Sequence, residues 1–357
     1  MNTTLRALVN QAERLVRAEA YQESIALCHA ILRRYPRYAR CYRILGQAHL
    51  GLGEFEEAAN LFRRSLGVDA EDPLAYAGLG VIYEERGLLD EAIWHMERAF
   101  ELASGRDELR RELARLYRQT GSRATVQLTR AALARLYARG GLWNKAVAEL
   151  NDLIAREPYR LDLWVTLART LWRAGRCDEA AVVAQSILDQ APNCLVARLI
   201  LGTHWRREGR EDEGRLLLQG AQELDPENVE ATRLLGAQSP LALRVARLEA
   251  DVSSPLADEE GRNPQGWPQQ ADGQELPPAG PAEIEEHALF PALPEDGAAD
   301  SGRVGEPEAA LGVEEVPAEC SRTRRFCGTA QEQGLECALN LAPEQPVLPP
   351  EEPPAAE

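Results

Sequence analysis

The sequence predicts an all-α protein whose helices come in repeated pairs that stack into a solenoid, followed by a disordered tail. Two observations predict the solenoid. Glycines recur every 34 residues between apolar-periodic segments, and the five prolines before residue 239 all fall at segment boundaries. The tail is predicted by composition, because 17 of the 22 prolines and the whole net charge of −17 lie in residues 239–357.

The spaced glycines mark the end of the first helix in each pair. They form two series with a 34-residue interval: Gly53, Gly87 and Gly121, then Gly141, Gly175 and Gly209. We expect each to adopt left-handed backbone, which glycine tolerates best. The prolines mark the other boundary, since proline is excluded from helix interiors. Four follow a second helix, and one precedes a first helix: Pro36, Pro158, Pro192, Pro226 and Pro73.

Each period repeats one pattern of large and small residues on its two helices. The clearest copy has Tyr76, Leu79, Gly80 and Tyr83, then Ala92, Met96 and Ala99. Four more copies match at Tyr42, Leu45, Gly46, Ala58 and Phe62; Arg130, Leu133, Ala134, Tyr137, Ala146 and Leu150; Trp164, Leu167, Ala168, Ala180 and Ala184; and Arg198, Leu201, Gly202, Trp205, Gly214 and Leu218. A weaker first copy has Leu8, Gln11, Ala12, Leu15, Ser24 and Cys28.

These residues resemble the tetratricopeptide repeat, with its pattern W-x2-L-G-x2-Y, A-x3-F and P. The six copies cover about two-thirds of the chain. The resemblance implies a right-handed solenoid of helix pairs in which small residues such as Gly80 and Ala168 let the two helices of a pair cross closely. It also implies that the first helices line a concave surface that binds peptides or partner helices.

The repeat loses its phase in the middle of the chain. Gly121 and Gly141 are separated by 20 residues, so about one helix is missing. We favour two blocks of about three repeats, 1–120 and 121–238, closed by helices at 107–120 and 229–236. Alternatively, residues 124–140 pack as the missing second helix and the superhelix continues. Residues 239–357 then form the acidic tail.

The predicted concave surface carries many arginines and few acids. The candidate partner-binding residues are Arg40, Arg43, Arg135, Arg139, Arg169, Trp172, Arg173, Arg206 and Arg207. Because arginine forms forked bonds to carboxylates, we expect an acidic protein or peptide partner. A competing interpretation is that these arginines are only the solvated face of helices in an arginine-biased protein, which has 39 arginines and one lysine. The same bias suggests a bacterial genome of high GC content. Nucleic acid is not expected, because residues 1–238 are neutral overall.

Two segments of the tail depart from plain low complexity. Leu241, Val245, Leu248 and Val252 have helical spacing and predict a short helix that extends the cap. Residues 283–296 set Ile284, Leu289, Phe290 and Leu293 among acids, as in a linear motif that orders on binding, although ordinary low-complexity sequence explains them too. An intramolecular contact of this tail with the arginine surface is a further hypothesis.

The sequence contains no recognisable catalytic loop, cofactor fingerprint or metal-ligand spacing. No membrane insertion is expected, since no apolar run approaches the ~20 residues that span a bilayer. We therefore expect a cytoplasmic adaptor or scaffold without enzymatic activity and without a cofactor. The alternative is a structural subunit of a larger assembly, such as a secretion or envelope complex.

Overall fold

The computed structural model describes residues 2–121 and 125–249, and these residues form 14 α-helices with one small sheet. The first helices of the pairs are α1 (Leu5–Arg17), α3 (Ala39–Leu52), α5 (Pro73–Glu85), α8 (Arg130–Arg139), α10 (Leu161–Arg173) and α12 (Leu195–Arg207). The second helices are α2 (Tyr21–Arg34), α4 (Phe55–Val68), α6 (Leu89–Leu102), α9 (Trp143–Arg156), α11 (Cys177–Gln190) and α13 (Glu211–Leu224). Two helices stand without a second partner, α7 (Asp107–Gln119) and α14 (Val229–Leu235), and a 3-10 turn, η1 (Gly236–Gln238), follows α14. The prediction of an all-α helix-pair solenoid is confirmed.

The spaced glycines adopt the predicted left-handed conformation. Their φ angles lie between 72° and 84° at Gly53, Gly87, Gly121, Gly141, Gly175 and Gly209. In the first repeat the same position, 34 residues before Gly53, is Glu19, and it takes φ 60° although it has a side chain. The backbone hydrogen bonds of the turn match as well. The N–H of Glu19 donates to the carbonyl of Val16, as the N–H of Gly53 does to the carbonyl of Leu50. The turn geometry is therefore set by the repeat and is imposed on Glu19.

Close crossings of paired helices depend on small residues, as the sequence predicts. A methyl group on Gly202 would lie 3.0 Å from the carbonyl oxygen of Gly214 on α13. A methyl group on Gly80 would lie 3.3 Å from the carbonyl oxygen of Ala92 on α6. Phe62 of α4 packs against both Gly46 on α3 and Gly78 on α5, so one second helix covers two successive first helices. This bridging carries the apolar core from each pair to the next.

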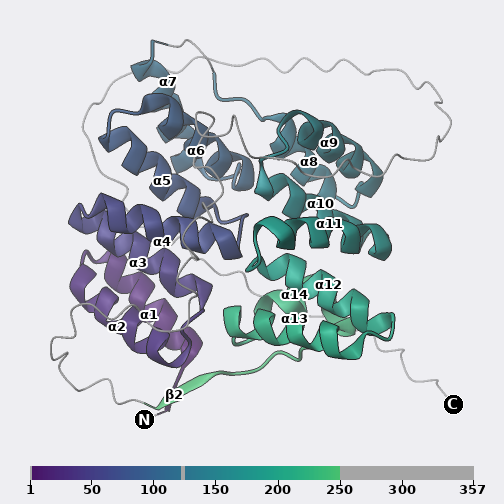
Figure 1. Ribbon diagram of the computed structural model, residues 1–357. Coiled ribbons are helices and arrows are strands. Elements are labelled where there is room, and N and C mark those ends of the chain that lie inside the picture. The colour runs from purple at the N-terminus through teal and green to yellow at the C-terminus, as the bar shows by residue number, and fades with distance from the viewer. Residues whose placement is uncertain (1, 122–124, 250–357) are drawn as a thin grey trace, which may run out of the picture.

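The pairs are arranged in two columns that run in opposite directions (Figure 1). Helices α1 to α7 stack upward in one column, and α8 to α14 descend beside it. The two columns touch, since Val68 and Ala70 of the first are buried in the core of the second. At the phase slip, α6 packs on α7, and after the connection α8 pairs with α9 and contacts α10.

The two ends of the described chain meet in a short antiparallel sheet. Strand β1 (Asn2–Thr4) pairs with β2 (Arg247–Glu249), with Thr3 opposite Leu248. The prediction of a helix over 241–252 is therefore wrong for the residues that the structure describes; Val252 lies outside them. The reason is alternation: Ala246 and Leu248 are buried while Val245 and Arg247 are exposed, which suits a strand once the N-terminal backbone offers a partner. Residues 283–296 also lie outside the described residues.

Candidate functional site: an arginine-rich face of the second column

The candidate arginines of the first column pair with acids of their own column. Arg40 and Arg43 both contact Glu13 of α1, at 3.0 and 2.9 Å, and Arg43 Nε lies 3.3 Å from Asp72. Burial alone would raise the pKa of Glu13, but Arg40 and Arg43 outweigh it and lower that pKa. These two arginines therefore join α1, α3 and the start of α5.

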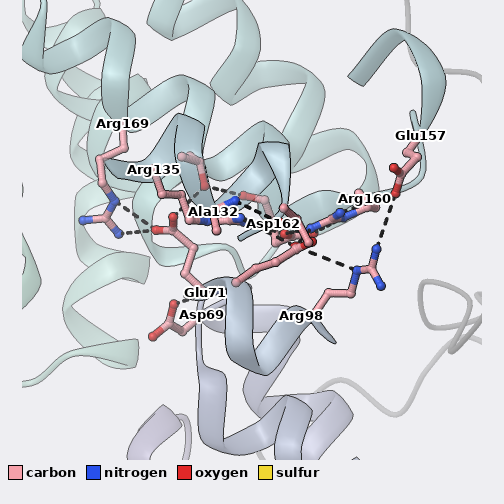
Figure 2. Close-up of polar contacts among 12 residues, drawn as sticks. Asp69, Glu71, Arg98, Ala132, Arg135, Glu157, Arg160, Asp162 and Arg169 are labelled. Carbon is pink, nitrogen blue, oxygen red and sulfur yellow. Dashed lines mark hydrogen bonds and ion pairs between the residues drawn. The ribbon is translucent and has the colours of Figure 1, made fainter. Parts of the chain in front are cut away.

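The inner arginines of the second column are paired with acids of both columns (Figure 2). Arg169 on α10 contacts Glu71, which lies in the turn before α5, at 3.0 Å, and it also pairs with Glu230 of α14. Glu71 further accepts a 2.7 Å hydrogen bond from the hydroxyl of Thr166. Arg135 on α8 is buried, bonds Asp162 at 2.5 Å and lies 3.8 Å from Glu101 of α6.

Arg135 belongs to a buried ionic cluster that joins the columns, which we call the latch: Arg98, Glu101, Arg135, Arg160 and Asp162. Arg160 bonds Glu101 at 2.5 Å and Asp162 at 2.8 Å, and every latch side chain is at most 8% exposed. Burial would raise the pKa of Asp162, but Arg160 and Arg135 hold it well below its usual range. The latch is thus a charged structural contact between the columns.

Arg98, Glu101 and Arg160 are not predicted as functional residues from the sequence. Arg160 and Glu101 are 59 residues apart and lie on opposite sides of the phase slip, so no spacing rule connects them. One sequence feature could have pointed to the latch, namely a charged residue at a position where the helical pattern predicts burial. Glu101 is a charged residue on the apolar-periodic part of α6, where a buried carboxylate needs a partner from elsewhere.

The remaining candidates in the second column form a regular exposed row, the arginine ladder. Arg139, Arg173 and Arg207 occupy one repeat position, 34 residues apart, in the last turns of α8, α10 and α12, and all three are exposed. Trp172 is buried beneath the row, and the guanidinium of Arg207 stacks 5.0 Å from its ring centroid. Arg206 is exposed too, but it pairs with Glu211 at 3.0 Å.

The ladder has an excess of positive charge around its middle member. The pKa of Arg173 is lowered, first by partial burial and then by the neighbouring Arg169 and Arg233. Among the described residues, neither Arg139 nor Arg173 has a carboxylate within ion-pair distance. The guanidinium of Arg207 is oriented by Trp172 and by a 2.6 Å hydrogen bond to Gln238. The row can therefore accept anions.

The tetratricopeptide repeat family model matches residues 9–73, 43–107, 131–193 and 165–229, which together exceed half of the chain. The chain thus has the architecture of a helical-repeat scaffold, with a basic face on one column. It belongs to the tetratricopeptide repeat family, whose repeats support protein–protein interaction and are typically not catalytic. The matches leave out residues 108–130, where the phase slip lies.

The chain is also similar to several solved structures. The structure of Naa15/Naa10 bound to HypK-THB shares 17% identity, covering 66% of this chain and 39% of that one, with a TM-score of 0.29. A structure of MamA AMB-1 shares 22% identity over 52% of this chain and 96% of that one, with a TM-score of 0.25. The structure of YrrB, described as a TPR protein with an unusual peptide-binding site, shares 17% identity. The match covers 58% of this chain and 98% of that one, with a TM-score of 0.26. Comparison with curated proteins gave no match.

No helix within residues 2–121 and 125–249 combines the length and the apolar character needed to cross a bilayer.

Proposed function

We propose that this protein is an adaptor that holds an extended acidic segment of a partner protein along the arginine ladder. The observation that carries the proposal is the division of the second-column arginines. The inner ones, Arg135 and Arg169, are paired with acids, whereas Arg139, Arg173 and Arg207 are exposed at one repeated position.

The spacing of the ladder suits an extended peptide. Successive first helices pack about 8–10 Å apart. A peptide in the polyproline II conformation has about three residues per turn and rises about 3.1 Å per residue, so every third side chain lies on the same face, about 9 Å further along, and can meet the next rung. A segment with acidic residues at i, i+3 and i+6 would place one carboxylate at each arginine, and the fork of the guanidinium can bind it through two bonds.

The chain already contains one such contact. Glu71 of the first column reaches Arg169 on the same face of α10, with its second oxygen held by Thr166. An arginine one turn from the ladder residue Arg173 thus accepts a carboxylate from a separate element. This internal contact supports an acidic ligand over an apolar one.

The test is peptide affinity with the ladder charges reversed. A fluorescent peptide with glutamate at every third position is titrated into full-length protein, and binding is followed by anisotropy. The triple variant Arg139→Glu, Arg173→Glu, Arg207→Glu should weaken binding roughly 5- to 150-fold, since three exposed charge pairs contribute about 1–3 kcal/mol together. Binding to the unaltered protein should also weaken as salt rises.

A matched control keeps the change in net charge but moves it to the second helices. It reverses three exposed arginines of α2, α9 and α13: Arg33, Arg156 and Arg215. If this control weakens binding as much as the ladder variant does, the peptide responds to net charge only and the ladder is not the site.

The acidic tail is the natural internal competitor for this site. Residues 239–357 hold 24 acidic and seven basic side chains, and a tethered segment acts at an effective concentration of about millimolar. Deleting residues 255–357 should therefore raise the affinity for the acidic peptide, and more so at low salt. Equal affinities before and after the deletion would rule out competition by the tail.

A further inference from the structure

The start of the second column presents two leucines to solvent where the repeat expects buried side chains. On α8, Leu133 is 36% exposed and Leu136 is 39% exposed. At the motif position of Leu133, the internal repeats have leucines that are at most 3% exposed: Leu45, Leu79, Leu167 and Leu201. In those repeats the second helix of the preceding pair packs on the first helix. Before α8 that helix is missing, because α6 packs mainly on α7 and meets α8 only in part, through Glu101 and Arg135.

In the first repeat, no second helix precedes the first helix, and the uncovered face of that helix is polar. On α1, the motif positions of Leu133 and Leu136 are occupied by Gln11 and Arg14, and both are exposed. Solenoids need such polar outer faces at their ends. Helix α8 stands at the same kind of end but keeps two leucines. Their retention indicates that something covers this face.

We propose that residues 306–316 of the same chain dock on α8 and take the place of the missing second helix. This segment has the pattern of the second helices that cover such faces elsewhere. Glu308-Ala309-Ala310 repeats Glu57-Ala58-Ala59 of α4 and Glu179-Ala180-Ala181 of α11. Val313 then stands where α4 has Phe62, the residue that packs against two successive first helices. Pro307 suits the first turn of a helix, and Pro317 ends the segment.

Charge and reach agree with this occupant. Helix α8 contains three arginines and no acid, while residues 306–316 contain four glutamates and no base. From Glu249 the intervening chain, 250–305, has a root-mean-square span of about 40 Å if it behaves as a flexible coil. Glu249 lies in β2 at the lower end of the columns, beside the N-terminal strand, and α8 stands about three steps between first helices above that end, or about 30 Å. The proposal does not depend on the arginine ladder, because apolar contacts carry it.

The test is hydrogen exchange of full-length protein, read by mass spectrometry on peptides that cover the tail. Docking should slow exchange of the amides of 306–316 about tenfold relative to those of 283–296, the other apolar segment of the tail. The double variant Leu133→Gln, Leu136→Arg copies the residues of the first repeat and should abolish this protection. The double variant Val313→Asp, Val316→Asp should abolish it as well.

The matched control, Ile284→Asp with Leu289→Asp, makes the same kind of change elsewhere in the tail and should leave the protection intact. Unchanged exchange in α10 and α12 shows that the α8 variant is folded; if it is not, the Val313 and Val316 variant alone decides, since it lies outside the folded repeats. Equal exchange of 306–316 and 283–296 in the unaltered protein would overturn the proposal. So would protection that survives either docking variant, or protection that grows with protein concentration, which indicates a second copy.

Discussion

Replacing Glu101 by glutamine should destabilise the protein far more than a typical loss of one ion pair. Glu101 is the carboxylate that the first column contributes to the latch, and its side chain is 2% exposed. It accepts a bond from Arg160 at 2.5 Å and lies 3.8 Å from Arg135 and 4.0 Å from Arg98. The substitution keeps the shape of the side chain and removes only its charge.

The magnitude follows from the charge count inside the latch. The three latch arginines face two fully buried carboxylates, Glu101 and Asp162, and after the substitution they face one. Of these arginines, the partly exposed Glu97 and Glu157 contact only Arg98 and Arg160, from the edge of the latch. Breaking a buried ion pair from one side costs about 3–5 kcal/mol, because the remaining charges stay buried without compensation. For a folded part of this size, a loss of 1 kcal/mol lowers Tm by roughly 2–4 °C, so we expect a drop of roughly 6–20 °C.

The assay is urea unfolding of full-length protein followed by circular dichroism, with Tm from thermal scans. The matched control is Glu149→Gln, which removes an exposed ion pair with Arg130 and should cost less than about 1 kcal/mol. A double-mutant cycle with Arg160→Met then measures the coupling between Arg160 and Glu101. If Glu101→Gln and Glu149→Gln shift the midpoint equally, the latch is not a desolvated contact and the two columns are not held together as described.

Three further substitutions test local features of the repeats. Glu19→Gly should raise the free energy of unfolding by about 1 kcal/mol, because Glu19 is held at φ 60° where the later repeats have glycine. Gly53→Glu should lower the free energy of unfolding. Urea midpoints check both substitutions, and a Glu19→Gly variant that is no more stable would contradict backbone strain at Glu19. Burial lowers the pKa of His95 to about 4, below its unfolded value near 6.5. The stability that neutral His95 supplies is therefore complete above pH 6.5 and lost as pH falls toward 4, by about 3 kcal/mol, and His95→Gln should remove that part of the pH dependence of the urea midpoint.

Repeat geometry was predictable from the sequence because it is encoded locally. A left-handed turn favours glycine at one position, as at Gly175, and a close crossing needs a small residue, as at Gly202, so spacing alone locates both. The contact between the columns was not predictable in the same way. Glu71 and Arg169 are 98 residues apart, and only the folding back of the second column brings them together.

The same limit explains the outcome at the candidate arginines and at the chain ends. Composition predicts an arginine-rich face, but composition does not show which arginines the protein itself neutralises. Arg135 and Arg169 are neutralised, because Asp162 and Glu230 of their own column pair with them and the first column adds Glu101 and Glu71. The segment at 245–248 fits helix and strand patterns alike, and pairing with the N-terminal residues decides for the strand.

The ion pairs between the two columns affect the rigidity of the face that carries the arginine ladder. A solenoid of helix pairs is held only by contacts between neighbours, so a binding face spread over three repeats bends with the stack. Here the second column is fixed at its upper end by the latch, at its middle by Glu71 on Arg169, and at its lower end by the bond from Arg37 to Glu223. We expect these contacts to keep the separation of α8, α10 and α12 nearly constant, and so also that of the rungs Arg139, Arg173 and Arg207. A preorganised ladder loses less conformational entropy when it binds an extended partner. Loosening the latch should therefore weaken peptide binding even though no latch residue lies on the exposed face.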